Sequence, residues 1–146
     1  MHGEPCNPEA YRLVPDKEKT IFVWRTMYRR DGAIAEGYIP VWSNGPEPEF
    51  TSHETACILN TSDADAHVEI TIDSSDQDPV GPGRVNVPAR RTKCVRFNDL
   101  NDPQQIPRGT DDASVIASDV PILVQHTRLD SRQAETALIT TVAYPG

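Results

Sequence analysis

The sequence predicts an all-β fold, an antiparallel β-sandwich of jelly-roll type with about eight strands. Short apolar runs recur along the chain, separated by segments rich in Pro, Gly, Asn and Asp. Several runs alternate apolar and polar residues, which is the period of a strand with one buried face. No segment keeps the period of an amphipathic helix. The 13 prolines fit loops and strand edges, where a missing N–H costs little.

The chain divides into an extension and one domain. Its 146 residues suit a single domain that buries a core of its own. Residues 1–30 are polar and contain three prolines, so we predict a loosely ordered N-terminal extension. Within it, residues 20–28 could form one strand or a helical turn. Met27 is a candidate start, which would make residues 1–26 an accessory arm or an artefact. Residues 31–146 are predicted to form the β-sandwich domain.

The first expected strands are short apolar runs bounded by turn-forming residues. Residues 33–35 form the first, and residues 37–50, with several prolines and an Asn-Gly pair, form a long loop. Residues 53–60 read as a strand with Ala56 and Ile58 on one face.

The next run alternates most clearly. In residues 67–73, Val68, Ile70 and Ile72 are expected inward and the polar residues between them outward. Residues 74–83 contain two prolines and two glycines and are predicted to be a loop. Later strands are predicted at residues 84–87, 92–97, 113–117, 122–129 and 137–144, with a long loop over residues 98–112.

The charge is distributed unevenly. The net charge is −8, but residues 1–30 carry six basic against four acidic side chains, so residues 31–146 carry −10. An acidic domain repels phosphate backbones, which disfavours nucleic acid as a partner. It is attracted to basic surfaces such as the cytoplasmic loops of membrane proteins. The alternative is that the acidity only keeps the protein soluble.

The cysteines and the hydropathy predict a cytoplasmic protein. Cys6, Cys57 and Cys94 are widely spaced, without a CxxC pair, so neither a disulfide framework nor a zinc knuckle is expected. We interpret them as small hydrophobes in a reducing compartment. The most apolar early stretch, residues 21–24, is too short for a membrane span and follows a mixed-charge segment, unlike a signal peptide.

The sequence favours binding over catalysis. It contains no GxSxG, P-loop, GxGxxG or HExxH motif, so we predict no enzyme activity and no cofactor. His53 and His126 could meet across a sheet and bind a metal with Glu54, but no ligand spacing supports this and no metal is predicted. A hydrolase would need a carboxylate pair from Glu36, Glu54 and Asp130, and nothing places two of them at catalytic separation.

Two clusters of polar residues are candidate binding surfaces. Arg90 and Arg91 begin the densest basic patch, which either pairs with neighbouring acids or contacts an anion or a partner. The run from residue 125 to 133 follows an apolar strand and carries several charged and hydrogen-bonding groups. It suits a polar ligand pocket, a subunit interface or, equally, a structural ion-pair network. Trp42 lies in the long loop, where it could stack on a sugar or close the end of the sandwich.

Five segments carry a resemblance to a known family. They are residues 33–40 (AIAEGYIP), 52–60 (SHETACILN), 87–92 (VPARRT), 96–100 (RFNDL) and 124–134 (VQHTRLDSRQA). In this order, and over about residues 33–144, the chain resembles the cyanobacterial sensory rhodopsin transducer family. It departs from the family where Asp31-Gly32 replaces an aromatic residue before the first strand.

The resemblance implies a small cytoplasmic protein with a jelly-roll-like sandwich that assembles as a homotetramer. It also implies a signal transducer that binds the cytoplasmic face of a sensory rhodopsin, a retinal-containing membrane photoreceptor. The alternative is a module for a carbohydrate or a small polar ligand, without a rhodopsin partner. DNA binding has been suggested for the family, and the charge of this chain argues against it. The residues predicted to bind a ligand or partner are Trp42, His53, Glu54, Arg90, Arg91, His126, Arg128, Asp130 and Arg132.

Overall fold

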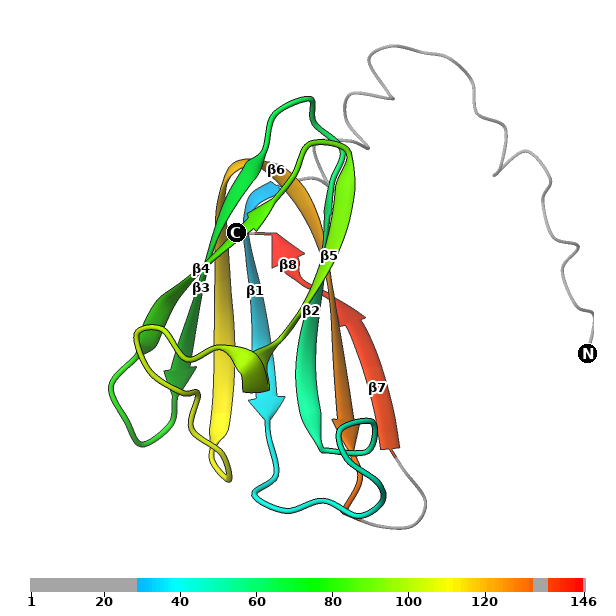
Figure 1. Ribbon diagram of the computed structural model, residues 1–146. Helices are drawn as coiled ribbons and strands as arrows, with labels where there is room; N and C mark the ends of the chain where they lie inside the picture. The colour runs from blue at the N-terminus through cyan, green and yellow to red at the C-terminus, as the bar shows by residue number, and fades with distance from the viewer. Residues whose placement is uncertain (1–28, 133–136, 146) are drawn as a thin grey trace, which may run out of the picture.

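The computed structural model describes residues 29–132 and 137–145, and in this part of the chain the fold is all-β with antiparallel pairing throughout (Figure 1). One short 3-10 helix, η2, interrupts the strands. Among the described residues, no helix has the length and hydropathy needed to span a membrane. The elements are β1 (Arg29–Tyr38), β2 (His53–Asn60), β3 (Ala66–Ser74), β4 (Val80–Val87), β5 (Arg91–Arg96), η2 (Phe97–Asp99), β6 (Asp111–Asp130), β7 (Ala137–Val142) and β8 (Tyr144–Pro145).

Strand β6 organises the sheet because it belongs to both halves of it. Its first part, residues 111–118, lies between β3 and β1, and its second part, residues 123–129, lies between β2 and β7. Strands β4, β5 and β8 extend the sheet beyond β3, β2 and β1. The sheet therefore curls around its apolar side, as Figure 1 shows. The all-β antiparallel prediction is confirmed; the jelly-roll sandwich stays a prediction.

The continuity of β6 corrects the prediction of two separate strands at residues 113–117 and 122–129. Pro121 lies within the strand, at the point where it passes from one half of the sheet to the other. Pairing with β3 ends at Ser118, and pairing with β2 resumes at Leu123. A proline is tolerated here because it lies between the β3–β6 pairing and the β2–β6 pairing, and neither pairing requires a backbone N–H at residue 121.

Strand β4 corrects the predicted loop over residues 74–83. The strand begins at Val80 and includes Pro82, which is tolerated because β4 pairs only with β3 among the described residues. Gly81 has a φ of +142°, and a Cβ there would lie 2.8 Å from the carbonyl oxygen of Ile70. Glycine is therefore required at this irregularity of the β3–β4 pairing.

Side-chain alternation builds the core as predicted. In β2 the even-numbered residues are buried, and in β3 Val68, Ile70 and Ile72 are each about 1% exposed. Each fully buried aliphatic side chain contributes about 1.5–3 kcal/mol. Phe97, on η2, closes the core from the side. The other buried apolar residues are Ile34, Ile39, Ala56, Ile58, Ala66, Val80, Val87, Val95, Ile106, Ile116, Ile122 and Val124.

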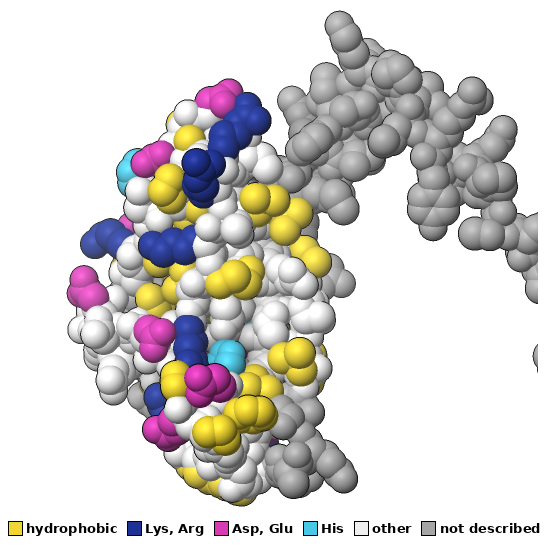
Figure 2. All heavy atoms as spheres, turned by 45° about the vertical axis from the view of Figure 1, so that its right-hand side comes forward, with side chains coloured by type: hydrophobic (Ala, Val, Ile, Leu, Met, Phe, Trp, Pro, Cys, Tyr) yellow, Lys and Arg dark blue, Asp and Glu magenta, His cyan; other side chains and the backbone are white. Residues whose placement is uncertain are grey.

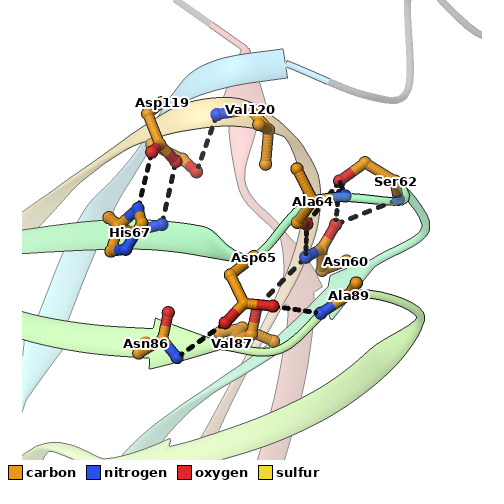
Figure 3. A network of polar contacts seen from close by, with 11 residues as sticks. Asn60, Ser62, Ala64, Asp65, His67, Asn86, Val87, Ala89, Asp119 and Val120 are labelled. Atoms are coloured by element: carbon orange, nitrogen blue, oxygen red, sulfur yellow. Dashed lines mark hydrogen bonds and ion pairs between the residues drawn. The ribbon is translucent and has the colours of Figure 1, made fainter.

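A polar network closes one end of the curled sheet (Figure 3). The buried Asn60 amide donates to the carbonyl oxygens of Ala64 (2.8 Å) and Val87 (3.0 Å), and its Oδ1 accepts from the backbone N–H of Ser62 (3.0 Å). These bonds join β2 to the turn before β3 and to the end of β4. One side chain on β2 thus satisfies backbone groups of two other segments.

The same end carries two exposed carboxylates that accept backbone hydrogen bonds. Asp65 accepts from the N–H of Ala89 (2.9 Å), and this bond lowers the pKa of its carboxyl. Asp119 accepts from the backbone N–H of His67 (2.8 Å) and pairs with its Nδ1 (2.7 Å), which raises the pKa of that imidazole. Both contacts lie far from the groove described below, so this end serves the fold.

Candidate functional site

A groove of about 250 Å³ opens between β1 and β7. It forms because the curled sheet does not close there: β1 pairs with β8 only at Gly32 and Ala33, and β7 pairs only with β6 among the described residues. Apolar side chains form most of its walls, with charged groups at one end. The groove is lined by Ala33, Ile34, Ala35, Glu36, His126, Arg128, Ile139, Thr141 and Val142.

Arg128 is the cation of the groove. Its guanidinium Nη1 lies 2.6 Å from Oε1 of Glu36, so the two side chains form an ion pair between β6 and β1. The side chain of Arg128 is 18% exposed, whereas that of Glu36 is 76% exposed. An ion pair with one solvated partner contributes little free energy. An anionic ligand could therefore displace Glu36 at a small cost.

Three titratable side chains are buried beneath the groove, on the inward faces of β2 and β6. They are Glu54, Asp112 and His126, exposed by 1%, 7% and 4%. Oε1 of Glu54 accepts a 2.8 Å hydrogen bond from the backbone N–H of Tyr38 and lies 3.7 Å from Nε2 of His126. Among the described residues, neither Nε2 of His126 nor Oδ2 of Asp112 has a hydrogen-bond partner.

Gly37 allows the two carboxylates to converge. It pairs with Asp112 across the β1–β6 ladder. A Cβ at this position would lie 2.1 Å from Oδ1 of Asp112 and 2.9 Å from Oε2 of Glu54. The absence of a side chain on β1 thus leaves the space that both carboxylates occupy.

The pKa of Asp112 is raised to about 7. Burial is the main cause, because it penalises the charged form, and the neighbouring Glu54 carboxylate adds to it. His126 and Arg128 oppose the rise by favouring the carboxylate. Near neutral pH this cluster therefore takes up or releases a proton on Asp112, a capacity absent from an ordinary aspartate.

Asp130 and Arg132 are engaged with each other instead of lining the groove. Nη2 of Arg132 lies 2.6 Å from Oδ2 of Asp130, and this hydrogen bonding lowers the pKa of the Asp130 carboxyl. The guanidinium also stacks over the ring of Tyr38, 5.3 Å from its centroid. Nearby, the hydroxyl of Ser131 donates to the carbonyl oxygen of Phe50 and accepts a hydrogen bond from the hydroxyl of Ser52 (3.1 Å). These contacts fix the turn after β6 against the long loop.

The two histidines considered as joint metal ligands, His53 and His126, are not brought together. His53 lies opposite Leu129 with its side chain on the outer face, where Nδ1 contacts the carbonyl oxygen of Thr51 at 2.7 Å. His126 lies opposite Ala56 and points inward. The two imidazoles therefore do not converge on a common site. Within residues 29–132 and 137–145, no three His, Cys, Asp or Glu side chains are arranged to hold a metal.

The remaining candidates lie away from the groove. Trp42 is 54% exposed in the loop after β1 and is not among the lining residues. Arg90 lies at the opposite end of the sheet and pairs with Asp63 at 2.7 Å, while Arg91 donates to the carbonyl oxygen of Arg90. Of the nine predicted residues, the structure thus brings Glu54, His126 and Arg128 to one place.

Sequence reasoning missed Asp112 and Gly37. Asp112 was assigned to a loop that ended there, although β6 already begins at Asp111. The alternation of Asp112, Ser114 and Ile116 carried a signal, because these residues share the buried face. Gly37 carried no such signal in the sequence, since only the tertiary fold brings the carboxylates of Glu54 and Asp112 next to it.

The cysteines require a correction. Cys57 and Cys94 form a disulfide, not two independent apolar side chains. They lie directly opposite each other on β2 and β5, so the pairing register brings the sulfur atoms together on the outer face. Their separation of 37 residues in the sequence gave no sign of this contact.

Comparison with known proteins identifies the family. The family model of the Anabaena sensory rhodopsin transducer matches residues 28–145. A solved structure described as Anabaena sensory rhodopsin transducer is 72% identical, covering 68% of this chain and 95% of that one, with a TM-score of 0.62. The crystal structure of Thermotoga maritima 1070 is 31% identical, covering 81% and 95%, with a TM-score of 0.70. No curated protein matches the sequence. The predicted resemblance is confirmed, and the chain belongs to the Anabaena sensory rhodopsin transducer family.

Proposed function

We propose that this chain is a non-enzymatic cytoplasmic signal transducer that binds the cytoplasmic face of a sensory-rhodopsin-type membrane photoreceptor. The observation that carries the proposal is the family match over residues 28–145, together with 72% identity to a solved Anabaena sensory rhodopsin transducer. The printed name of that relative describes a transducer of a sensory rhodopsin.

The charge of the domain supports this partner. Residues 31–146 carry a net charge of −10, and several of their carboxylates are exposed. Asp73, Asp76 and Asp78 are exposed together at the end of β3 and in the loop after it. Cytoplasmic loops of membrane proteins are enriched in Lys and Arg. Complementary charge of this kind accelerates association and makes it sensitive to salt.

Binding to the receptor should weaken as salt rises. With a purified photoreceptor in nanodiscs, we expect the dissociation constant to rise at least tenfold between about 50 and 500 mM salt, because the Debye length shrinks from roughly 14 to 4 Å. Replacing Asp73, Asp76 and Asp78 by Asn should slow association several-fold. Surface plasmon resonance measures both effects.

Arg108→Gln, in the loop before β6, is the matched control for that experiment. It removes an exposed charge of the opposite sign, so association should stay unchanged or become faster. No detectable binding at either salt concentration would remove the receptor from the proposal. Binding without any salt dependence would remove its electrostatic basis.

The groove supports a second candidate, a site for a small polar ligand. The volume of the groove, about 250 Å³, lies below the range of about 300–1,000 Å³ that is usual for ligand pockets. The groove therefore suits a molecule no larger than a monosaccharide. Arg128 supplies the charged group, and His126 supplies a ring within the lining. The apolar walls favour a ligand with one polar end and one apolar side.

A thermal-shift screen tests this candidate. A ligand at 100 times its dissociation constant stabilises the folded protein by about 2.7 kcal/mol, which raises the melting temperature by several degrees. We expect Arg128→Met to abolish the shift and Trp42→Ala to preserve it, because Trp42 lies outside the groove. A panel of monosaccharides and small carboxylates that gives no shift with the unmodified chain would exclude the candidate.

A further inference from the structure

The disulfide occupies an accessible position in the sheet. Cys57 is half-buried and Cys94 is exposed, and β5 pairs only with β2 among the described residues. The bond crosses from β2 to β5, so a nucleophile that attacks Sγ of Cys94 in line with it arrives from the open side of β5. In-line attack on Sγ of Cys57 would arrive from the side of β6, where Gln125 is the direct neighbour. The sulfur of Cys94 is therefore the one open to a second protein.

The apolar core lies on the opposite side of the sheet from this bond. Val95 and Phe97, exposed by 9% and 1%, pack inward at the end of β5 and on η2. The hydroxyl of Thr92 also donates a 3.2 Å hydrogen bond to the carbonyl oxygen of Ile58, alongside the β2–β5 pairing. Opening the disulfide therefore loosens the edge strand and leaves the core packed, so the bond can be broken and formed again in a folded chain.

The strand that carries Cys94 is basic. Arg91, Lys93 and Arg96 lie within three residues of it, and residues 90–98 contain no Asp or Glu. No carboxylate among the described residues pairs with these three side chains. In Figure 2 the Lys and Arg side chains gather toward the left and the top of the visible face, beside a mostly neutral surface. In a chain of net charge −8, this basic edge favours an acidic partner.

The compartment points to the chemistry of the pair. This inference rests on the cytoplasmic location in the proposed function. In the cytoplasm most thiols are kept reduced, and the disulfides that do form are mainly transient or redox-sensing. Exposed disulfides are also reduced more readily than structural ones. We propose that Cys57 and Cys94 form a reversible redox site that exchanges with an acidic protein dithiol bound at the basic edge strand β5.

The exchange proceeds in two steps. A thiolate of the dithiol attacks Sγ of Cys94 and forms a bond between the two proteins, and Cys57 leaves as a thiolate. The second thiolate of the partner then attacks the partner sulfur of this mixed disulfide and displaces Cys94. The partner is oxidised to its own disulfide, and two electrons have passed to this chain. The two protons lost by the partner's thiols are taken up by Cys57 and Cys94. The oxidised form of the partner reverses both steps.

Reduction should reach the long loop after β1 through Arg96. Nη2 of Arg96 donates hydrogen bonds to the carbonyl oxygens of Pro48 (3.2 Å) and Thr51 (3.0 Å). When β5 is no longer tied to β2, these contacts are made by a looser strand. Hydrogen–deuterium exchange of the reduced chain should be about tenfold faster in β5 and around Thr51, and unchanged in β3.

The rate of reduction of the full chain tests the proposal. Alkylation followed by mass spectrometry shows when Cys57 and Cys94 become free thiols. At about 50 mM salt, an acidic thioredoxin should reduce the folded chain, and the double variant Arg91→Gln/Lys93→Gln should lower the rate constant about tenfold.

Two controls isolate the role of β5. Arg84→Gln/Arg108→Gln removes the same charge from β4 and from the loop before β6, so it should keep the rate of the unmodified chain. The neutral reagent dithiothreitol should reduce all three proteins equally. Raising the salt to about 500 mM should remove the difference between the two double variants, because screening weakens charge attraction.

Three results would overturn the inference. If the thioredoxin reduces the bond only after urea has unfolded the chain, the disulfide is structural. Equal rates for the two double variants would exclude docking at β5. Reduction by glutathione as fast as by thioredoxin would exclude a protein dithiol as the partner. None of these measurements uses the photoreceptor, so the redox site and receptor binding can fail independently.

Discussion

Reducing the disulfide between Cys57 and Cys94 should lower the free energy of unfolding by about 3–4 kcal/mol. The bond closes a segment of 37 residues, and closing a segment of that length restricts the unfolded chain considerably. It also ties β5 to β2, and β5 has no other strand partner among the described residues. We therefore expect a shift of many degrees in the melting temperature, since about 1 kcal/mol corresponds to about 4 °C at this size.

Urea unfolding with and without a phosphine reductant measures this effect. The variants Cys57→Ser and Cys94→Ser should unfold at the midpoint of the reduced protein under both conditions. Cys6→Ser is the matched control, because it leaves the disulfide intact and should keep the response to reductant. Identical midpoints of the oxidised and reduced protein would show that the bond contributes no stability.

The second large effect concerns Asp112. Its pKa is about 7 in the folded protein, against an ordinary value of 3.8. Between these values the folded protein binds more protons than the unfolded chain, so the free energy of unfolding falls as pH rises from about 4 to about 7. Asp112→Asn removes the charge that burial and Glu54 disfavour. Since one pKa unit corresponds to about 1.4 kcal/mol and nearby charges and solvent reduce the effect, we expect a gain of about 1–3 kcal/mol at pH 8.

Urea titrations at pH 5 and pH 8 test the sign and the size of this effect. Asp112→Asn should be more stable than the unmodified protein at both values, and the difference should be clearly larger at pH 8 than at pH 5. Asp78→Asn, at an exposed position in the loop after β3, is the control and should leave the pH dependence intact. If Asp112→Asn is less stable than the unmodified protein at pH 8, the ionised Asp112 carboxylate must have a stabilising hydrogen-bond partner, although Oδ2 has none among the described residues.

Local patterns in the sequence predicted the elements in which one face is buried. The alternation in residues 67–73 became β3 with its predicted inward residues, and residues 53–60 became β2 with the predicted bounds. Patterns failed where tertiary context overrides the local chemistry of proline and glycine. Pro121 was read as a break although β6 changes partners there, and Gly81 as part of a loop although it lies within β4.

The candidate site was predictable only in part. Polar residues on otherwise apolar strands identified Glu54, His126 and Arg128, because a buried polar group needs a structural or functional reason. Their neighbours come from distant segments, and the register that unites them is a property of the whole sheet. The same limitation applies to Cys57 and Cys94, whose contact depends on how β2 pairs with β5.

The course of β6 through both halves of the sheet has a consequence for unfolding. Both parts of this strand have partners on each side, so neither half can open without exposing its backbone amides. The two halves should therefore melt in one cooperative transition, and the central amides of β6 should exchange with deuterium only through global unfolding. The outer strands β4 and β5, each with one partner among the described residues, should exchange first.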